Sequence, residues 1–379
     1  MAHCGDVLNY IKAAIDAHGG AIDFSQFMQH ALHAPGLGYY SAGAHKFGQA
    51  GDFVTAPEIS PLFGRCLARQ CQQVLSQLSA GEILEVGAGS GKLARDVLLQ
   101  LKALDGLPER YLILESSADL RQRQQTLLRQ ALPDDFARIV WLDRLPDADF
   151  SGVVIANELL DAFGVHRLEK RAGEWRELGV SYRADGLQWC YLDGDSQACH
   201  QLRQRLEGTA ASLDEGYQTE VNLTADAWLR SLAAGLDRAL VVLIDYGYSR
   251  AQYYHPQRHR GTLRCHYRHR AHDDPFLYPG LQDITAHVEF TAIAESALAC
   301  GLDVLGYTTQ AYFLMACGLL EFLNDDADVR QVERLEMARQ VKLLTLPAEM
   351  GEAFKVIALG HNIEADLLGF RLCDQRARL

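Results

Sequence analysis

Paired cysteines are missing from the 379-residue sequence, which has no two cysteines at the two-residue spacing that structural zinc sites use. Its nine cysteines are scattered along the chain and odd in number. A disulfide framework is typical of short secreted chains with regularly spaced cysteines, so this pattern predicts free thiols in a reducing compartment. We therefore expect neither a disulfide-stabilised fold nor a structural zinc site.

Long hydrophobic runs and early basic residues are also missing. The longest apolar stretch, residues 312–323, falls short of the roughly 20 residues that cross a bilayer. The first arginine is Arg65, and the first twenty residues show no basic-then-apolar leader pattern. The formal net charge of −13 disfavours general binding to nucleic acid or to an anionic membrane surface. We expect a cytoplasmic protein with no membrane insertion and no nucleic-acid partner.

Apolar strand-like runs alternate with amphipathic helical patterns through the middle of the chain. Hydrophobic residues make up 48% of the sequence, which is enough for a sizeable core. This alternation predicts an α/β fold with a parallel, Rossmann-like sheet covered by helices on both faces. The runs lie at residues 82–86, 110–115, 137–142, 152–156 and 239–247, and two late candidates at 302–308 and 353–360 would complete the sheet.

Four segments follow one another along the chain. Residues 1–80 are expected to form N-terminal helices and a glycine-rich lid loop, with a helix from Pro61 that Ser60 caps. Residues 81–164 form the first part of the Rossmann-like domain. Residues 165–235 are an insertion of short antiparallel strands and helices, and residues 236–379 form the second part of the domain.

A glycine turn follows the first strand, in the run ILEVGAGSGKLARDVL (residues 83–98). Small residues let the backbone approach a ligand, and a helix N-terminus offers free N–H groups to it. A dinucleotide fingerprint requires a third glycine at position 92, which is Lys92 here. The spacing of Gly87, Gly89 and Gly91 therefore favours S-adenosylmethionine over a dinucleotide.

Acidic residues stand where this cofactor would need them. Glu115 ends the second strand and is placed to accept hydrogen bonds from both ribose hydroxyls. Asp143, at the end of the third strand, is a candidate acceptor for the adenine amino group, with helix capping as the alternative. Glu85, just before the turn, could help to hold the ammonium group. Together these residues predict a cofactor site.

A second acidic cluster, NELLDAF (residues 157–163), follows the fourth strand. Ligands of open α/β sheets lie outside the carboxyl ends of the strands, so Asn157, Glu158 and Asp161 are candidate catalytic residues that face the methyl acceptor. We expect Glu158 and Asp161 to share one helix face, from which two carboxylates could hold a guanidinium. The alternative is that Asn157 caps that helix and the acids only favour its first turn.

The glycine-rich stretch of residues 34–57 is interpreted as a lid or binding loop. Gly51 and Asp52 have no structural explanation in the sequence and are assigned to a lid that closes over the cofactor. Thr55 and Glu58 have capping-box spacing, so the start of a helix explains them.

Histidine and arginine gather at residues 255–272, which suggests zinc at first sight. Five nearby arginines would repel a cation and no second cysteine is present, so we assign no metal. A surface loop that docks an acidic partner and arginines that hold the cofactor carboxylate stay open. Downstream, His287 is a candidate base, although a histidine hydrogen-bonded in the core explains it equally well.

Five motifs together resemble the MidA-type methyltransferases over roughly residues 15–360. They are GYYSAGAHKFGQAGDFVTAPEISPLFG, ILEVGAGSGKLARDVL, VVIANELLDAF, GTLRCHYRHRAHDDPF and LQDITAHVEF. The resemblance implies a seven-strand methyltransferase sheet with an added N-terminal segment, S-adenosylmethionine as the cofactor, and cofactor contacts from Gly87, Gly89 and Glu115. Glu289 stands where the family pattern has an aspartate.

The family's mitochondrial member, a complex I assembly methyltransferase, dimethylates a protein arginine. The resemblance thus implies protein arginine methylation, with a respiratory complex I subunit as a candidate partner. Apart from the resemblance, a homodimer is kept as a candidate assembly. Methylation of a small molecule and a non-catalytic, cofactor-binding assembly factor are the two alternatives.

Overall fold

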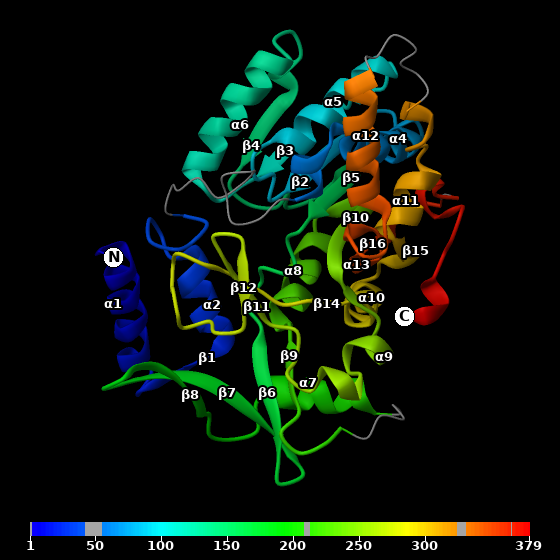
Figure 1. Cartoon of the computed structure of the whole chain (residues 1–379). Helices are drawn as coiled ribbons and strands as arrows, with labels where there is room; N and C mark the ends of the chain where they lie inside the picture. The colour runs from blue at the N-terminus through cyan, green and yellow to red at the C-terminus, as the bar shows by residue number, and fades with distance from the viewer. Residues whose placement is uncertain (1, 42–54, 208–212, 324–330, 365) are drawn as a thin grey trace.

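The computed structural model describes residues 2–41, 55–207, 213–323, 331–364 and 366–379 (Figure 1). Within these residues no helix is both long enough and apolar enough to pass through a bilayer.

The main sheet has seven strands along its path, as expected, and an eighth at the side among the described residues. Strands β4, β3, β2, β5 and β10 are parallel, whereas β16 lies antiparallel between β10 and β15. The two-residue strand β14 adds to β10. In spatial order the strands are β15 (Asp303–Thr309), β16 (Phe354–His361), β10 (Leu236–Tyr248), β5 (Phe150–Asn157), β2 (Glu82–Val86), β3 (Tyr111–Leu114) and β4 (Ile139–Leu142), and β14 spans Val288–Glu289.

The strand order reverses between β2 and β5. From β2 the chain moves outward to β3 and β4, and it then returns to the other side of β2 to form β5 and β10. Loops that leave neighbouring strands in opposite directions open a crevice at the carboxyl ends of those strands. The turns after β2 and β5 therefore lie on either side of the expected ligand site.

Helices cover both faces of this sheet because its strands carry apolar residues on both sides. Ile83 packs into the core layer that holds α4 and α5, and its neighbour Leu84 packs into the layer that holds α8 and α10. The helices of these layers are α4 (Pro61–Leu75), α5 (Lys92–Ala103), α6 (Ala118–Ala131), α8 (Leu223–Ala233), α10 (Phe290–Ala299), α11 (Gln310–Ala316), α12 (Gln331–Thr345) and α13 (Met350–Ala353). The Ser60 side chain caps α4 by accepting from the Leu62 N–H, as predicted.

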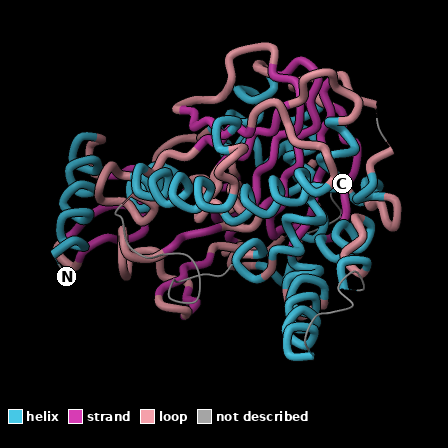
Figure 2. Tube along the Cα trace, turned by 90° about the horizontal axis from the view of Figure 1, so that it is seen from above, coloured by secondary structure: helices cyan, strands magenta, loops and turns pink. Residues whose placement is uncertain are grey.

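A second sheet joins the N-terminal segment to the insertion. The antiparallel strands expected at residues 165–193 are present, and the short strand β1 pairs with β7 through Ala21 and Ser181. In Figure 2 the N-terminal helix lies at one end of the molecule and the strands of the main sheet at the other. This part contains α1 (Ala2–Ala17), β1 (Ala21–Asp23), α2 (Phe24–His33), β6 (His166–Arg171), β7 (Glu174–Arg183), β8 (Gly186–Tyr191), α7 (Gln197–Leu206) and β9 (Gln218–Val221).

A small third sheet packs against α2. It is formed by β12 (Arg270–His272), β11 (Arg264–Tyr267) and β13 (Asp283–Thr285), and Cys265 and Ile284 bury their side chains in the same cluster as the apolar face of α2. The remaining short elements are α3 (Ala56–Ile59), α9 (Arg250–Tyr253) and the 3₁₀ turns Phe136–Arg138, Pro256–Arg258, Glu321–Leu323, Leu368–Phe370 and Arg376–Arg378.

Candidate active site

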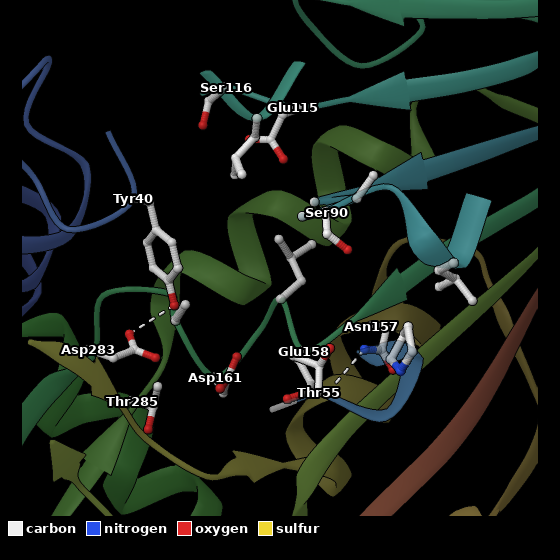
Figure 3. Close-up of a pocket in the computed structure, with 18 of the residues that line it drawn as sticks. Tyr40, Thr55, Ser90, Glu115, Ser116, Asn157, Glu158, Asp161, Asp283 and Thr285 are labelled. Atoms are coloured by element: carbon white, nitrogen blue, oxygen red, sulfur yellow. Dashed lines mark hydrogen bonds between the residues drawn. The ribbon is translucent and has the colours of Figure 1, made fainter. Parts of the chain in front are cut away.

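A cavity opens at the carboxyl ends of β2, β3 and β5, where the strand order reverses. Its volume is about 1180 Å³ when the open mouth is included. Figure 3 shows Glu115, Ser116 and Ser90 toward one end, and Tyr40, Glu158, Asp161, Asp283 and Thr285 toward the other. We call these the cofactor end and the acceptor end.

The glycine turn forms the floor of the cofactor end. Gly87, Gly89 and Gly91 all have positive φ angles, of 74°, 52° and 81°. L-residues with a side chain rarely adopt such angles, so the turn requires glycine. Gly87 and Gly89 line the cavity, whereas Gly91 sits behind it at the start of α5, where an added Cβ would lie 3.1 Å from Gln124 Cγ.

Glu115 lines the cavity directly after β3, the position predicted for a ribose-binding acid. Its Oε1 accepts from the Ser117 N–H at 2.9 Å, and its Oε2 accepts from Gln124 Nε2 at 3.3 Å. The same Gln124 nitrogen donates to the Gly89 carbonyl at 2.9 Å. Gln124 from α6 thus fixes the glycine turn and the acid relative to each other, a role that no sequence motif had marked.

Glu85 also lines the cavity, but its carboxyl faces the neighbouring strand in part. Tyr111 donates its hydroxyl proton to Glu85 Oε2 at 2.6 Å. Burial raises the pKa of Glu85 to about 7, and the Tyr111 hydrogen bond opposes that rise. A positive group bound nearby would restore its charge.

The three remaining residues predicted to bind the cofactor cannot be placed in the cavity. Asp143 follows β4, as expected, yet its carboxyl is 91% exposed, pairs with Arg121 at 2.7 Å and does not line the cavity. Gly51 and Asp52 lie outside the described residues. The roles assigned to all three stay predictions.

The turn after β5 differs from the sequence-based expectation. No helix follows Asn157: residues 158–165 form an irregular turn, and Glu158 has a left-handed φ of 52°. A residue in that conformation cannot be the first residue of a right-handed helix, which is the position that Glu158 would hold if Asn157 were the cap. The shared helix face of Glu158 and Asp161, and the capping role of Asn157, were therefore wrong. All three side chains nevertheless line the cavity.

A buried carboxylate holds this turn in place of helical hydrogen bonds. Asp245 Oδ2, from the end of β10, accepts from the N–H groups of Leu160 and Asp161 at 3.0 and 3.2 Å. Its Oδ1 accepts from the Tyr246 N–H. The sequence carries a signal for this residue, because Asp245 is the one charged residue in the otherwise apolar run at residues 239–247.

Burial raises the pKa values of two acids at the acceptor end. It raises the pKa of Glu158 to about 8, assisted by the nearby charge of Asp161. Burial likewise raises the pKa of Asp161 to about 6, although Tyr246 donates to its Oδ2 at 2.5 Å. Three oxygens here have no hydrogen-bond donor within the described chain: Asn157 Oδ1, Glu158 Oε2 and Asp161 Oδ1.

The short helix α3 links the two ends of the cavity. Glu58 forms no capping box; its carboxylate accepts from the Ser90 hydroxyl and pairs with Lys92 Nζ at 2.6 Å. A helix does begin after Thr55, as the spacing predicted, but the capping hydrogen bonds are not formed, and Glu58 instead holds the glycine turn. At the start of α3, the Ala56 N–H donates to Glu158 Oε1 at 3.4 Å.

Residues distant in sequence complete the acceptor end. The Tyr40 hydroxyl donates to Asp283 Oδ1 at 2.9 Å across 243 residues (Figure 3). His33 from the end of α2, His266 from β11 and Thr285 from β13 also line the wall. The motifs containing Tyr40 and Asp283 had been noted, but no local pattern indicates that they meet.

Comparison with known proteins identifies the family of the chain. A family model described as S-adenosyl-L-methionine-dependent methyltransferase matches residues 66–308, more than half of the chain. The chain belongs to this methyltransferase family. It is 30% identical to the mitochondrial protein arginine methyltransferase NDUFAF7 homolog of Drosophila melanogaster, over 94% of this chain and 85% of that protein. The mouse protein arginine methyltransferase NDUFAF7 is 28% identical over 90% of the chain and 81% of its own length.

A solved structure of a similar protein agrees with this family assignment. The crystal structure of a superfamily member from Burkholderia thailandensis, bound to S-adenosyl-homocysteine, is 44% identical with a TM-score of 0.93, covering 100% of this chain and 97% of that one. These findings confirm the resemblance to the MidA-type methyltransferases, the Rossmann-like methyltransferase fold and S-adenosylmethionine as the cofactor.

The cofactor end of the cavity has the chemical groups that S-adenosylmethionine requires. Gly87 and Gly89 present backbone without a side chain to the cavity, and Glu85 and Glu115 offer buried carboxyl groups to the ammonium and hydroxyl groups of S-adenosylmethionine. We therefore assign Gly87, Gly89, Glu85 and Glu115 as its candidate contacts.

The basic segment contributes little to the methyltransferase cavity. Only His266 of residues 255–272 lines it, so the alternative that these arginines hold the cofactor is not supported. Across the described ranges, no group of three or more metal-ligating side chains has the arrangement of a metal site. His287 lies outside the cavity lining, edge-on to Tyr246 and Tyr248, and burial lowers its pKa to about 4.

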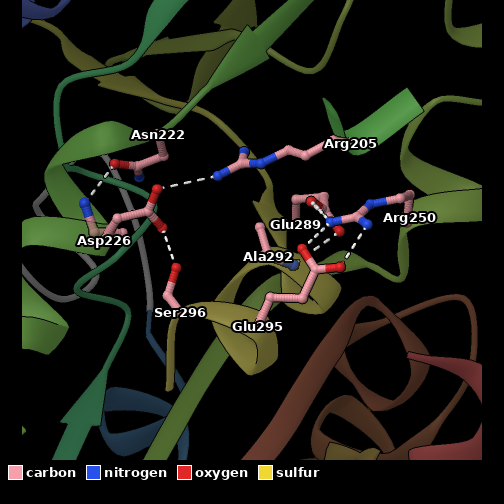
Figure 4. A network of polar contacts seen from close by, with 9 residues as sticks. Arg205, Asn222, Asp226, Arg250, Glu289, Ala292, Glu295 and Ser296 are labelled. Carbon is pink, nitrogen blue, oxygen red and sulfur yellow. Dashed lines mark hydrogen bonds and ion pairs between the residues drawn. The ribbon is translucent and has the colours of Figure 1, made fainter. Parts of the chain in front are cut away.

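Glu289 has a structural task in the methyltransferase. Figure 4 shows it at the start of α10 beside Arg250, with which it pairs at 3.4 Å while it accepts from the Ala292 N–H. In the same network Asp226 of the insertion pairs with Arg205 at 3.1 Å and accepts from the hydroxyl of Ser296, in α10, at 2.6 Å. The network ties the insertion to the helices behind the main sheet.

Proposed function

We propose that this methyltransferase modifies an arginine side chain of a protein. Three buried oxygens at the acceptor end carry the proposal, because no donor among the described residues reaches Asn157 Oδ1, Glu158 Oε2 or Asp161 Oδ1. A buried acceptor without a donor is costly, so the site is built for a ligand rich in N–H groups.

A guanidinium matches this demand better than other acceptor groups. It is planar, permanently charged and carries five N–H donors in a fixed fork, which two carboxylates and an amide oxygen can satisfy together. A lysine ammonium is a compact point charge with three donors, so it lacks the planar fork that can bind two carboxylates side by side. A hydroxyl or thiol acceptor has one proton to donate, so it would leave at least one of the oxygens Glu158 Oε2 and Asp161 Oδ1 without a donor.

The chain's residues would orient the acceptor and take up its proton. Bound S-adenosylmethionine supplies a methyl group on a sulfonium sulfur. The carbon–sulfur bond breaks as a carbon–nitrogen bond forms, the sulfur keeps the electron pair, and the attacking nitrogen loses one proton. Glu158, whose pKa burial raises to about 8, can accept that proton and release it to solvent. Asp161, anchored by Tyr246, would hold the remaining charge.

The relatives support the same acceptor. Two of them, from fly and mouse, are named as protein arginine methyltransferases and align over most of their length. A subunit of a respiratory complex is the first candidate substrate that we would test.

The test uses radiolabelled S-adenosylmethionine and lysate from a strain that lacks the protein. We expect label in a protein band and, after hydrolysis, in methylarginine. Glu158→Gln removes a charge from the acceptor end, so we expect transfer to fall by roughly 100-fold or more. Binding of S-adenosyl-homocysteine, measured by calorimetry, should change by less than about twofold because Glu158 is not assigned to the cofactor.

Glu109→Gln is the control. Glu109 is exposed and lies just before β3, at the amino ends of the strands and so away from the cavity, and its replacement should leave both quantities unchanged. Label confined to small molecules would overturn the proposal, as would normal transfer by the Glu158 variant.

A further inference from the structure

A basic segment, residues 255–272, ends in the β11–β12 hairpin next to the acceptor end of the cavity. The segment contains five arginines, five histidines and no acid, whereas the whole chain carries a net charge of −13. Arg264 is neutralised by Asp273. Arg268 and Arg270, at the end of the β11–β12 hairpin, are exposed, and in the described part of the chain no carboxylate pairs with Arg270.

The tip of this hairpin has a costly sequence. Tyr267 pairs with Arg270, so Arg268 and His269 form a two-residue turn, and their φ angles are 48° and 61°. Turns that need positive φ at both positions favour Asn-Gly, because other residues are strained there. Arg268 lies over the Tyr267 ring, 5.2 Å from its centroid, and Tyr267 packs against Tyr278. The turn is thus less stable than an Asn-Gly turn would be, and it places cationic side chains next to the packed rings of Tyr267 and Tyr278.

The tip lies close to the cavity. His266 lines the acceptor end, and it pairs across the sheet with Asp283, which lines it as well. A strand rises by about 3.3 Å per residue, so the turn begins roughly 7 Å beyond His266. Figure 1 shows the hairpin beside α2, whose last residue, His33, is on the cavity wall.

We propose that the β11–β12 hairpin docks an acidic segment of the protein that carries the methyl acceptor. This inference rests on the proposed function. The cavity is acidic and attracts a cation, whereas the neighbouring hairpin is basic, so one substrate segment can satisfy both surfaces. An extended chain spans up to about 3.5 Å per residue, which places the matching acidic residues two to four positions from the acceptor.

Peptide binding tests the inference without catalysis. Two fluorescent peptides carry glutamine at the acceptor position; one has Asp and Glu two to four residues away, and the other has Asn and Gln there. With the enzyme saturated in S-adenosyl-homocysteine, we expect the acidic peptide to bind about tenfold more tightly by anisotropy. That preference should shrink between 50 and 300 mM salt, as screening predicts.

Charge reversal locates the surface. Arg268→Glu combined with Arg270→Glu should abolish the preference for the acidic peptide. Arg129→Glu combined with Arg238→Glu makes the same change in net charge at exposed positions near the end of α6 and the start of β10, and it should keep the preference.

A third variant separates docking from folding. Arg268→Asn combined with His269→Gly installs the residues that this turn favours, so the melting temperature should rise while binding of the acidic peptide weakens. Weaker binding by a more stable protein cannot be ascribed to unfolding.

Two results would overturn the inference: equal affinity for both peptides, or tighter binding of a single-stranded oligothymidylate than of the acidic peptide. The proposed function fails separately. If arginine versions of the peptides bind but receive no methyl group, the docking surface stands and the acceptor assignment falls.

Discussion

At the scale of single residues, the protonation of Glu158 governs how the enzyme receives a cation. Burial raises its pKa to about 8, so near neutral pH the free enzyme holds a proton there that a bound guanidinium would expel. We expect kcat/KM for the protein acceptor to rise by up to about tenfold per pH unit below pH 8 and to level off above it.

Asp161→Asn provides the diagnostic shift for this pH profile. The charge of Asp161 raises the pKa of Glu158, so its removal should move the rising limb to lower pH. Asp143→Asn, which changes an exposed carboxyl outside the cavity lining, should leave the limb in place. A profile that is flat between pH 6 and 8 would contradict the assignment of Glu158.

Single residues also mark where sequence reasoning reached its limit. Glu85, Gly87, Glu115 and Glu158 could be selected because each follows or ends a recognisable strand. The Tyr40–Asp283 contact could not, since it depends on how the N-terminal segment and the third sheet pack together. Local spacing carries no information about such a contact.

At the scale of elements, the glycine turn makes a quantitative test possible. Gly91→Ala combines an unfavourable φ of 81° with a Cβ placed 3.1 Å from Gln124 Cγ. We expect a loss of about 2 kcal/mol in unfolding free energy and weaker binding of S-adenosyl-homocysteine, because Gln124 also holds Glu115.

The matched control for Gly91 is Gly173→Ala. Gly173 has nearly the same φ, 80°, but an added Cβ would meet nothing within 4 Å. It should lose about 1 kcal/mol from backbone strain alone and leave cofactor binding unchanged. Equal effects of the two substitutions in urea denaturation would mean that the contact with Gln124 carries no weight.

Helices and strands were predicted well where an apolar pattern repeats along the sequence. They were predicted poorly where the conformation or contact of a single residue determines the local structure. The strand at residues 82–86 and the helix that begins at Pro61 follow apolar periodicity and capping chemistry. The helix expected after Asn157 failed because Glu158 adopts a left-handed conformation that Asp245 stabilises from another strand. The capping box at Thr55 failed because Glu58 has stronger partners on the glycine turn. Both errors lie where a tertiary contact overrides a local preference.

At the scale of the whole molecule, the acids of the cavity should cost the free enzyme stability. Burial raises the pKa of Glu85, Glu158 and Asp161 to about 7, 8 and 6 respectively, and it raises that of Asp245 as well. Between about pH 4.5 and 8 the folded chain retains protons that the unfolded chain has released. Folding stability therefore falls as pH rises through this range.

Glu158→Gln isolates one part of this cost. The variant cannot be destabilised by ionisation at position 158, so its stability relative to the natural protein should grow between pH 5.5 and pH 8, by roughly 1–3 kcal/mol. Urea denaturation of both proteins without cofactor measures the difference, and Glu109→Gln should show no such growth. The same substitution is expected to lower methyl transfer by roughly 100-fold or more. A gain in stability coupled to a loss of activity would show that these carboxylates are kept for the acceptor, because folding alone would favour their replacement. A stability difference that does not change with pH would mean that Glu158 ionises freely, and the proton-accepting role proposed for it would then lose its physical basis.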